Sequence, residues 1–336
     1  MLIIGCDYHP YGQTIAMVDT ATGELTRRNL EHPNGEAERF YRSLPPGALI
    51  GIEATGATQW FERLVAECGH ELWVGDAAVI KAKQAGKPKT NERDALHLLD
   101  LLVGGQFPRL WVPSPGERDV RQLLQHRAQQ VQAQTKVKGQ LHGLAMAQGL
   151  CRKHKLFSRA GRELLEKLEL GPWASRRRRD LLAQFDSLQP EIAELDQAVA
   201  EEGARRPEVA QLRRIKGVGP VVALAFVLTV GPIRRFLRSR QLVAYLGLNP
   251  RENSTGDHQR LGHITKQGNK MMRWLLVEAA QTAVRCDPEM HRIYARLKFR
   301  RGANVAKVAI ARRLAVKMYW TLRQASERGA SGSHVR

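Results

Sequence analysis

Hydrophobic residues in roughly the first hundred positions follow strand spacing at first, and then alternate between strand and helix spacing. The apolar run at 2–4 is typical of a buried central strand, and a turn at 20–23 separates two strands of mixed polarity. Proline and glycine at 45–47 then interrupt the first helical segment. The expected strands are 2–4, 13–19, 24–30, 48–52 and 71–74, and the expected helices are 35–43, 59–67, 77–84 and 91–103. This order predicts an α/β fold whose sheet begins with an antiparallel meander, as in ribonuclease-H-like domains.

The rest of the chain has mostly helical spacing. Apolar residues recur in this way over 117–148, and a second stretch covers 177–199. Pro190 lies inside the second stretch and predicts either a kink or two separate helices. We expect an antiparallel helical arm that contacts DNA or serves dimerisation, followed by an all-α region. The predicted domains are 1–113 (α/β), 114–204 (coiled-coil arm) and 205–328 (helical), with a flexible tail at 329–336.

The charge balance favours a polyanionic partner. The chain has 53 Lys and Arg residues against 33 Asp and Glu, which gives a net charge of +20. Such a surplus points to nucleic acid before membrane, because no lipid-inserting element accompanies it. A run of arginines often forms only a solvated helix face, but here we expect contacts with a phosphate backbone. The run consists of Arg176, Arg177, Arg178 and Arg179.

The cysteines and the N-terminal residues predict a cytoplasmic location. Cys6, Cys68, Cys151 and Cys286 stand far apart without a Cys-x-x-Cys pair, which disfavours a zinc site or a disulfide framework. The apolar start has no basic region before it and soon reaches Asp7, so it does not resemble a signal peptide. No apolar run approaches the ~20 residues of a membrane span, and we expect no membrane partner.

Several oxygen-bearing side chains stand where predicted strands end and a helix begins. Asp7 and Glu53 each follow an apolar strand, and they would meet at one edge of the sheet if those strands were neighbours. Asn91 and Asp94 are three residues apart at a helix start and share one face. Clustered oxygen ligands suit hard divalent cations such as Mg²⁺ or Mn²⁺. The alternative is that these residues serve only as turn residues and helix caps.

A turn-rich loop near the C-terminal end of the chain offers a hydroxyl group beside a basic helix start. Gly247 and Pro250 stop one helix, and Ser254 and Gly256 follow in the loop. Amide donors at a helix start combine with fixed cations to form a phosphate site, so Ser254 is a candidate nucleophile. The alternative is that Ser254 or Thr255 only caps a turn. The expected phosphate-binding residues around the second helix start are Lys266, Asn269, Lys270 and Arg273.

A second candidate phosphate contact lies at 214–220. Gly217 and Gly219 permit a tight turn, and Pro220 suits the first position of a helix. The pattern is typical of a helix-hairpin-helix turn whose amides reach a DNA phosphate, although an ordinary helix–helix turn has the same features.

Taken together, these motifs resemble the DEDD transposases of the IS-one-ten insertion-sequence family over nearly the whole chain and in the same order. The resemblance begins with Asp7 in Gly-Cys-Asp-Tyr-His, Glu53 in Ile-Glu-Ala-Thr-Gly, and the segment Lys-Thr-Asn-Glu-Arg-Asp-Ala at 89–95. It continues through 217–220, Phe236, 242–250, Ser-Thr-Gly at 254–256, 266–269 and Arg273.

The resemblance implies an N-terminal RuvC-like domain, a coiled-coil arm and a C-terminal helical transposase domain, working as a homodimer or tetramer. It implies recombination of double-stranded donor and target DNA, guided by a structured non-coding RNA, through a phosphoserine intermediate. On this chain the nucleophile would be Ser254, and Asp7, Glu53 and Asp94 would hold Mg²⁺ or Mn²⁺.

Two positions depart from the family pattern. The third acidic position falls on Asn91, which removes one negative charge from the metal site, and Glu92 is turned ~100° away on a helix. Thr255 stands where many relatives have a second serine, so it is the rival nucleophile. Two other functions stay open: a hydrolytic RuvC-like nuclease or junction resolvase, and a non-catalytic helix-hairpin-helix DNA-binding protein.

Overall fold

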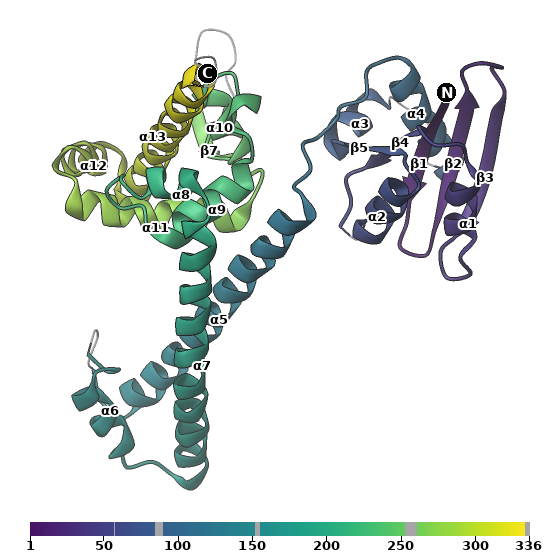
Figure 1. Cartoon of the computed structure of the whole chain (residues 1–336). Helices are drawn as coiled ribbons and strands as arrows, with labels where there is room; N and C mark the ends of the chain where they lie inside the picture. The colour runs from purple at the N-terminus through teal and green to yellow at the C-terminus, as the bar shows by residue number, and fades with distance from the viewer. Residues whose placement is uncertain (57, 85–89, 152–154, 253–260, 333–336) are drawn as a thin grey trace. The chain divides into compact units, whose positions relative to one another are not determined.

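The computed structural model describes residues 1–56, 58–84, 90–151, 155–252 and 261–332 (Figure 1). Its contacts divide the chain into two compact units, Met1–Val112 and Pro113–Arg336, which are described separately below. Among the described residues, no helix is long and apolar enough to cross a membrane.

The first unit is built on a five-stranded sheet of order β3-β2-β1-β4-β5. The first three strands form the antiparallel meander that the sequence predicts, and β4 and β5 join parallel to β1. The strands are β1 (Leu2–Tyr8), β2 (Gly12–Asp19), β3 (Leu25–Glu31), β4 (Leu49–Glu53) and β5 (Glu71–Gly75). β1 and β4 are neighbours, which is the condition under which Asp7 and Glu53 meet at one edge of the sheet.

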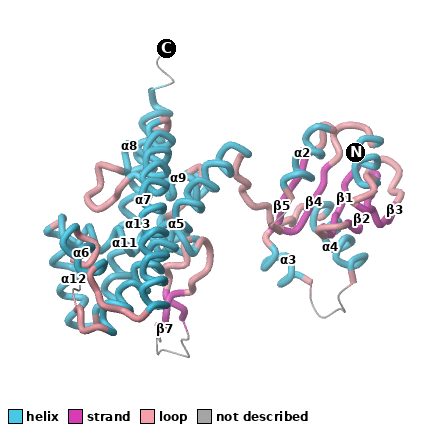
Figure 2. Tube along the Cα trace, turned by 90° about the horizontal axis from the view of Figure 1, so that it is seen from below, coloured by secondary structure: helices cyan, strands magenta, loops and turns pink. Residues whose placement is uncertain are grey.

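Helices cover both faces of this sheet, and Figure 2 shows α2 on one side with α3 and α4 on the other. Alternate residues of β1 serve the two faces: Ile4 packs in the core beneath α1 and α2, whereas Ile3 packs against α4. A Cβ on Gly5 would lie 2.2 Å from the carbonyl oxygen of Ala95, so only glycine lets α4 approach the sheet this closely. The helices are α1 (Glu36–Ser43), α2 (Gln59–Glu67), α3 (Ala77–Lys83) and α4 (Asn91–Val103).

The second unit begins with a helical arm. Two long helices, α5 (Pro115–Ala147) and α7 (Pro172–Ala204), pack along each other, and α6 (Arg159–Glu166) lies against their far end (Figure 1). A separate small core that includes Leu141, Leu165 and Phe185 holds the three helices together. α7 is a single helix with Pro190 inside it, so the two-helix alternative is wrong.

Most residues of α9 are buried, because this helix packs against α5, α7, α8 and α11. The remaining helices are α8 (Pro207–Leu212), α9 (Pro220–Val230), α10 (Ser239–Tyr245), α11 (Lys270–Cys286), α12 (Pro288–Arg301) and α13 (Ala303–Gly332), with a 3₁₀ turn at Ile233–Arg235. α13 extends to Gly332, into the segment 329–336 for which the sequence predicts a flexible tail. The loop predicted after α10 contains a short hairpin of β6 (Pro250–Glu252) and β7 (Leu261–Ile264).

Candidate functional site

Asp7 and Glu53 come from neighbouring parallel strands. The register pairs Cys6 of β1 with Ile52 of β4, and each carboxylate residue is the next one along its strand. Each lies two residues beyond a glycine (Gly5 or Gly51) that faces the side of the sheet on which α4 packs. Because side chains alternate along a strand, both carboxylates belong to this same face. The structure therefore brings these two predicted metal ligands to one edge of the sheet.

The N-terminal turn of α4 supplies the other two predicted ligands. Thr90 caps the helix, with its hydroxyl oxygen 3.4 Å from the backbone nitrogen of Arg93. The Asp94 carboxylate accepts a hydrogen bond of 2.6 Å from Nε2 of Gln84. Among the residues that the structure describes, no group of three or more His, Cys, Asp or Glu side chains could hold a metal ion. Asp7 and Glu53 thus share one face of the sheet, but in the described part of the chain they form no such cluster with Asp94.

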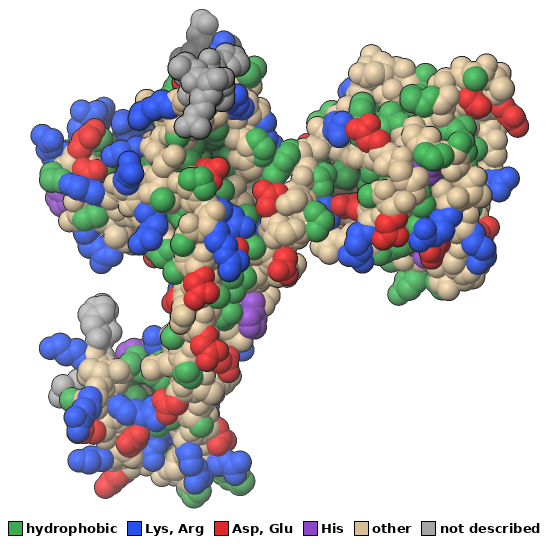
Figure 3. Space-filling model, viewed as in Figure 1, with side chains coloured by type: hydrophobic (Ala, Val, Ile, Leu, Met, Phe, Trp, Pro, Cys, Tyr) green, Lys and Arg blue, Asp and Glu red, His purple; other side chains and the backbone are tan. Residues whose placement is uncertain are grey.

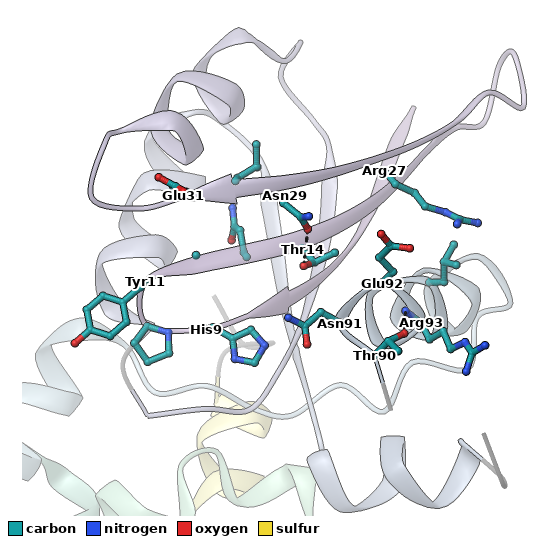
Figure 4. A pocket seen from close by; sticks show the side chains of 15 residues that line it. His9, Tyr11, Thr14, Arg27, Asn29, Glu31, Thr90, Asn91, Glu92 and Arg93 are labelled. Atoms are coloured by element: carbon teal, nitrogen blue, oxygen red, sulfur yellow. Dashed lines mark hydrogen bonds between the residues drawn. The ribbon is translucent and has the colours of Figure 1, made fainter. Parts of the chain in front are cut away.

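A cavity of about 1060 Å³ lies where this turn meets β2 and β3 (Figure 4). Both Asn91 and Glu92 line it, so the one-residue step between them does not remove Glu92 from the cavity. Its wall combines basic, acidic and neutral polar groups, including Thr14, whose hydroxyl donates a 2.8 Å hydrogen bond to Asn29. The other charged or polar lining side chains include His9, Arg27, Glu31, Thr90 and Arg93.

His9 is a candidate functional residue that the pattern analysis did not single out. Its Nε2 lies 3.1 Å from Oδ2 of Asp7, and its ring is about half exposed, whereas the Asp7 side chain is 14% exposed. A carboxylate beside a partly exposed imidazole can orient the ring. The signal available in the sequence was the two-residue spacing at the end of a strand.

Cys6, in contrast, has no chemical role that its environment supports. The thiol is fully buried and lies 3.1 Å from Oε1 of Gln13. Burial raises the pKa of the Cys6 thiol far above its ordinary value, so this cysteine stays protonated and unreactive.

Ser254 and Thr255 lie outside the described residues, but the structure shows how the segment that contains them is anchored. The chain leaves β6 at Glu252 and re-enters β7 at Leu261, and these two residues are paired in the hairpin. Below the strands, the backbone nitrogen of Thr265 donates a 2.8 Å hydrogen bond to the carbonyl of Asn249.

Two glycines close the base of this hairpin. A Cβ on Gly247 would lie 2.1 Å from the carbonyl oxygen of Gln267, and a Cβ on Gly268 would lie 2.1 Å from that of Tyr245. Both glycines have positive φ values, 67° and 70°, which other residues rarely adopt. The end of α10 and the start of α11 are therefore held in direct backbone contact, on either side of the serine segment.

We expect Gly268→Ala to lower the free energy of unfolding of the second unit by about 1–3 kcal/mol, because the methyl group adds a backbone clash to an unfavourable φ. Thermal unfolding followed by circular dichroism measures this change. Gly262→Ala is the matched control in β7, where the nearest atom to a new Cβ lies at an ordinary 3.7 Å. Equal melting temperatures for the two variants would contradict the proposed glycine contact.

The predicted phosphate-binding residues beside the hairpin divide into two kinds. The Asn269 side chain caps α11 by accepting a 2.9 Å hydrogen bond from the backbone of Met272. The Arg273 guanidinium donates to the carbonyl of Gln267, and burial lowers its pKa. Lys266 and Lys270, in contrast, are exposed. Lys266 and Lys270 therefore present positive charge to solvent, whereas Asn269 and Arg273 make contacts that hold the hairpin base together.

The predicted helix-hairpin-helix turn lies between α8 and α9. Gly217 has φ 90°, and a Cβ there would lie within 2.7–2.8 Å of Ala283, so this glycine packs against α11. Gly219 faces open space and lines a cavity of about 620 Å³ together with Arg285 and Lys307. Gly217 lines the same cavity, so both glycines border it, but only Gly219 has open space at its α-carbon.

The arginine run in α7 is also divided between structural and exposed side chains. Nη1 of Arg178 donates to the carbonyl oxygens of Leu165 and Leu168, at 3.0 and 2.7 Å, and so ties the end of α6 to α7. Arg176 pairs with Asp180 one turn later at 3.0 Å. The exposed side chains of Arg177 and Arg179 have no ion pair within the described part of the chain.

We expect Arg178→Ala to destabilise the arm by about 2–3 kcal/mol, because two carbonyl groups would lose a charged hydrogen-bond donor. Chemical denaturation of the full chain, followed by helix content, measures the loss. The matched control Arg177→Ala removes the same charge from an exposed position and should leave stability within about 0.5 kcal/mol. A loss of the same size in both variants would contradict the structural role of Arg178.

The sequence of this chain is similar to those of several proteins named as transposases. Residues 209–295 match the model of the "Transposase IS116/IS110/IS902 family". A "Probable family 20 transposase" of Pseudomonas aeruginosa is 29% identical over 328 residues, covering 95% of this chain and 96% of the relative. The "Transposase for insertion sequence element IS1111A" of Coxiella burnetii is 27% identical, covering 83% of this chain and 78% of the relative. The "Transposase for insertion sequence element IS1328" of Yersinia enterocolitica is 24% identical, covering 84% and 86%. Residues 209–295 are therefore similar to transposases of the IS116/IS110/IS902 family, and the relatives that resemble most of the chain are named as transposases.

Proposed function

We propose that the protein is a DNA recombinase in which Ser254 attacks a DNA phosphodiester. The serine oxygen forms a bond to phosphorus, the phosphodiester bond to one strand breaks, and that strand leaves with a hydroxyl end after taking up a proton. A strand with a free hydroxyl then attacks the phosphoserine, which restores the serine hydroxyl and joins the new strand. The phosphodiester bond energy is kept in the covalent intermediate, so strands are exchanged without net hydrolysis.

The observation that carries this proposal is the glycine-closed hairpin around the serine segment. Its base is fixed by the contacts of Gly247 and Gly268 and leads directly into α11. The exposed lysines Lys266 and Lys270 lie where the hairpin meets the N-terminal end of this helix. Positive charge beside a helix start supports phosphate binding close to Ser254.

The residues of the first unit that would hold a divalent cation, Mg²⁺ or Mn²⁺, are Asp7, Glu53, Asn91 and Asp94. The donors fit such an ion chemically, because Asp7, Glu53, Asn91 and Asp94 all offer oxygen atoms. When bound, the ion would lower the pKa of a hydroxyl group and stabilise charge on the phosphate. The Asp94 and Asp7 carboxylates each contact their neighbours, Gln84 and His9 respectively, through a single oxygen, so cation binding does not require either contact to break.

The proposal also includes the fold of the first unit, the nucleic-acid partners and the oligomeric state. The strand order β3-β2-β1-β4-β5, with β2 antiparallel to its neighbours, supports a RuvC-like assignment for Met1–Val112. The net charge of +20 supports binding of double-stranded donor and target DNA and of a structured guide RNA. The long α5–α7 arm suits a homodimer or tetramer, in which the two active regions come from one subunit or from two.

A hydrolytic nuclease is the second candidate, and the Asp7–His9 pair favours it. A histidine oriented by a carboxylate can take a proton from water at the edge of the 1060 Å³ cavity, which His9 lines. This reaction would release cut DNA with no protein attached, and it would leave the serine hairpin without a role.

The test is to incubate the purified protein with Mg²⁺, DNA from the ends of its own element and RNA transcribed from the adjacent non-coding segment. Denaturing gels then separate protein-linked DNA from free fragments. The proposal predicts a covalent adduct that forms in Mg²⁺ and does not form when EDTA is present from the start. Cut DNA without protein would support the nuclease, and DNA binding without any cleavage would support the non-catalytic alternative.

A further inference from the structure

A fully exposed aromatic ring lies in the last turn of α12. Phe299 is 94% exposed, which leaves a large apolar surface in water. No other large hydrophobic side chain of α12 is exposed to this degree, since Met290 is buried and Ile293 and Tyr294 pack partly against the core. Those inner residues hold the helix in place, so the outward position of Phe299 follows from a fixed element.

The surroundings of this ring are strongly basic. Arg292 and Arg296 precede Phe299 by seven and three residues, and all three are exposed on one face of the helix. Lys298, Arg300 and Arg301 complete the same last turn, whereas the only acid within α12 is Glu289 in its first turn. In Figure 3 the blue Lys and Arg side chains gather over the region of α12, with few red ones among them.

This combination selects one class of partner. A lipid surface requires a broad apolar face, and α12 presents a single exposed ring. An apolar groove on a protein partner would bind the Phe299 ring but would not require the five cations that lie beside it. A nucleic-acid strand offers both required features, since an unpaired base has a flat apolar face and the adjoining phosphates are anionic. The exposed face from Arg292 to Phe299 extends about 10 Å along the helix axis. This length is sufficient to contact more than one phosphate of a strand.

We propose that Phe299 stacks on an unpaired base of a DNA strand while Arg292 and Arg296 contact the phosphates beside it. The inference rests on the proposed recombinase function, because strand exchange creates DNA with unpaired bases. α12 would then hold the separated strand, in a role distinct from the covalent chemistry of Ser254.

The experiment measures binding of the full chain, in EDTA, to a blunt DNA duplex, the same duplex with a single-stranded flank, and an RNA oligomer of the flank sequence. Fluorescence anisotropy gives the dissociation constants, and 2-aminopurine in the flank reports stacking by its quenching. The variants are Phe299→Leu, which keeps an apolar group without a ring, and Phe299→Trp, which keeps the ring. Leu237→Ala is the control, since Leu237 is 74% exposed and lies outside α12.

We expect Phe299→Leu to weaken binding of the flanked duplex about tenfold and to remove the quenching, with no change for the blunt duplex. Phe299→Trp and Leu237→Ala should bind all probes as the wild type does. Equal affinities of Phe299→Leu and wild type for the flanked duplex would overturn this inference while leaving adduct formation untouched. An effect confined to the RNA probe would overturn the DNA assignment, and a wild-type chain that binds no DNA would overturn the recombinase proposal as well.

Discussion

Ser254→Ala should reduce covalent protein–DNA adducts by roughly a thousandfold or more, to below detection on a denaturing gel. The methyl group cannot attack phosphorus, and no other hydroxyl in a correctly folded hairpin would take its place. Affinity for DNA should remain within about twofold of the wild type, because the lysines at Lys266 and Lys270 and the hairpin base are unchanged.

Thr255→Ala is the matched control for this result. It removes the neighbouring hydroxyl and should leave at least about a third of the adduct, since Thr255 has no covalent role in the proposal. The reverse outcome, with adduct lost in Thr255→Ala and kept in Ser254→Ala, would assign the nucleophile to Thr255. Loss in both variants together with unchanged DNA binding would indicate that the hairpin needs both hydroxyl groups.

Asp7→Asn should lower the rate of adduct formation by at least roughly 100-fold at saturating Mg²⁺, because a neutral amide replaces a carboxylate at the junction of β1 and β4. The substitution keeps the side-chain shape, so the melting temperature of the chain should change little. Single-turnover kinetics with increasing Mg²⁺ measures the effect, and the concentration needed for half-maximal rate should rise.

Two variants of α4 provide controls for the metal account. Asp100→Asn removes a carboxylate from an exposed position in the later half of the helix and should leave the rate unchanged. Asn91→Asp adds a carboxylate at the start of α4 and should lower the Mg²⁺ concentration needed for half-maximal rate. A rate that is insensitive to both Asp7→Asn and EDTA would contradict metal assistance.

Much of the first unit could be predicted from the sequence because its strands and helices have strong, distinct periodicities. The run at Leu2, Ile3 and Ile4 predicted a central strand, and the start of a helix at Asn91 is confirmed. The neighbouring positions of Asp7 and Glu53 followed from one assumption about strand order, which the parallel pairing of β1 and β4 bears out.

The hairpin and the divided roles of the basic residues could not be predicted in the same way. β6 consists of Pro250, Arg251 and Glu252, which have no alternating apolar pattern, so its pairing depends on contacts at the glycine-closed base. Arg178 and Arg177 are chemically identical in the sequence, and only the carbonyl groups at the end of α6 distinguish them. His9 became a candidate for the same reason, through a partner whose side-chain position the sequence does not give.

The most direct measurement is to identify the residue that carries the DNA. The wild-type adduct would be digested with nuclease and protease, and mass spectrometry of the peptide covering 252–260 would locate the attached nucleotide or phosphate. The recombinase account predicts a phosphodiester-linked remnant on Ser254, absent from the Asp7→Asn sample. A remnant on any other side chain, or cleaved DNA with no linked peptide, would contradict it.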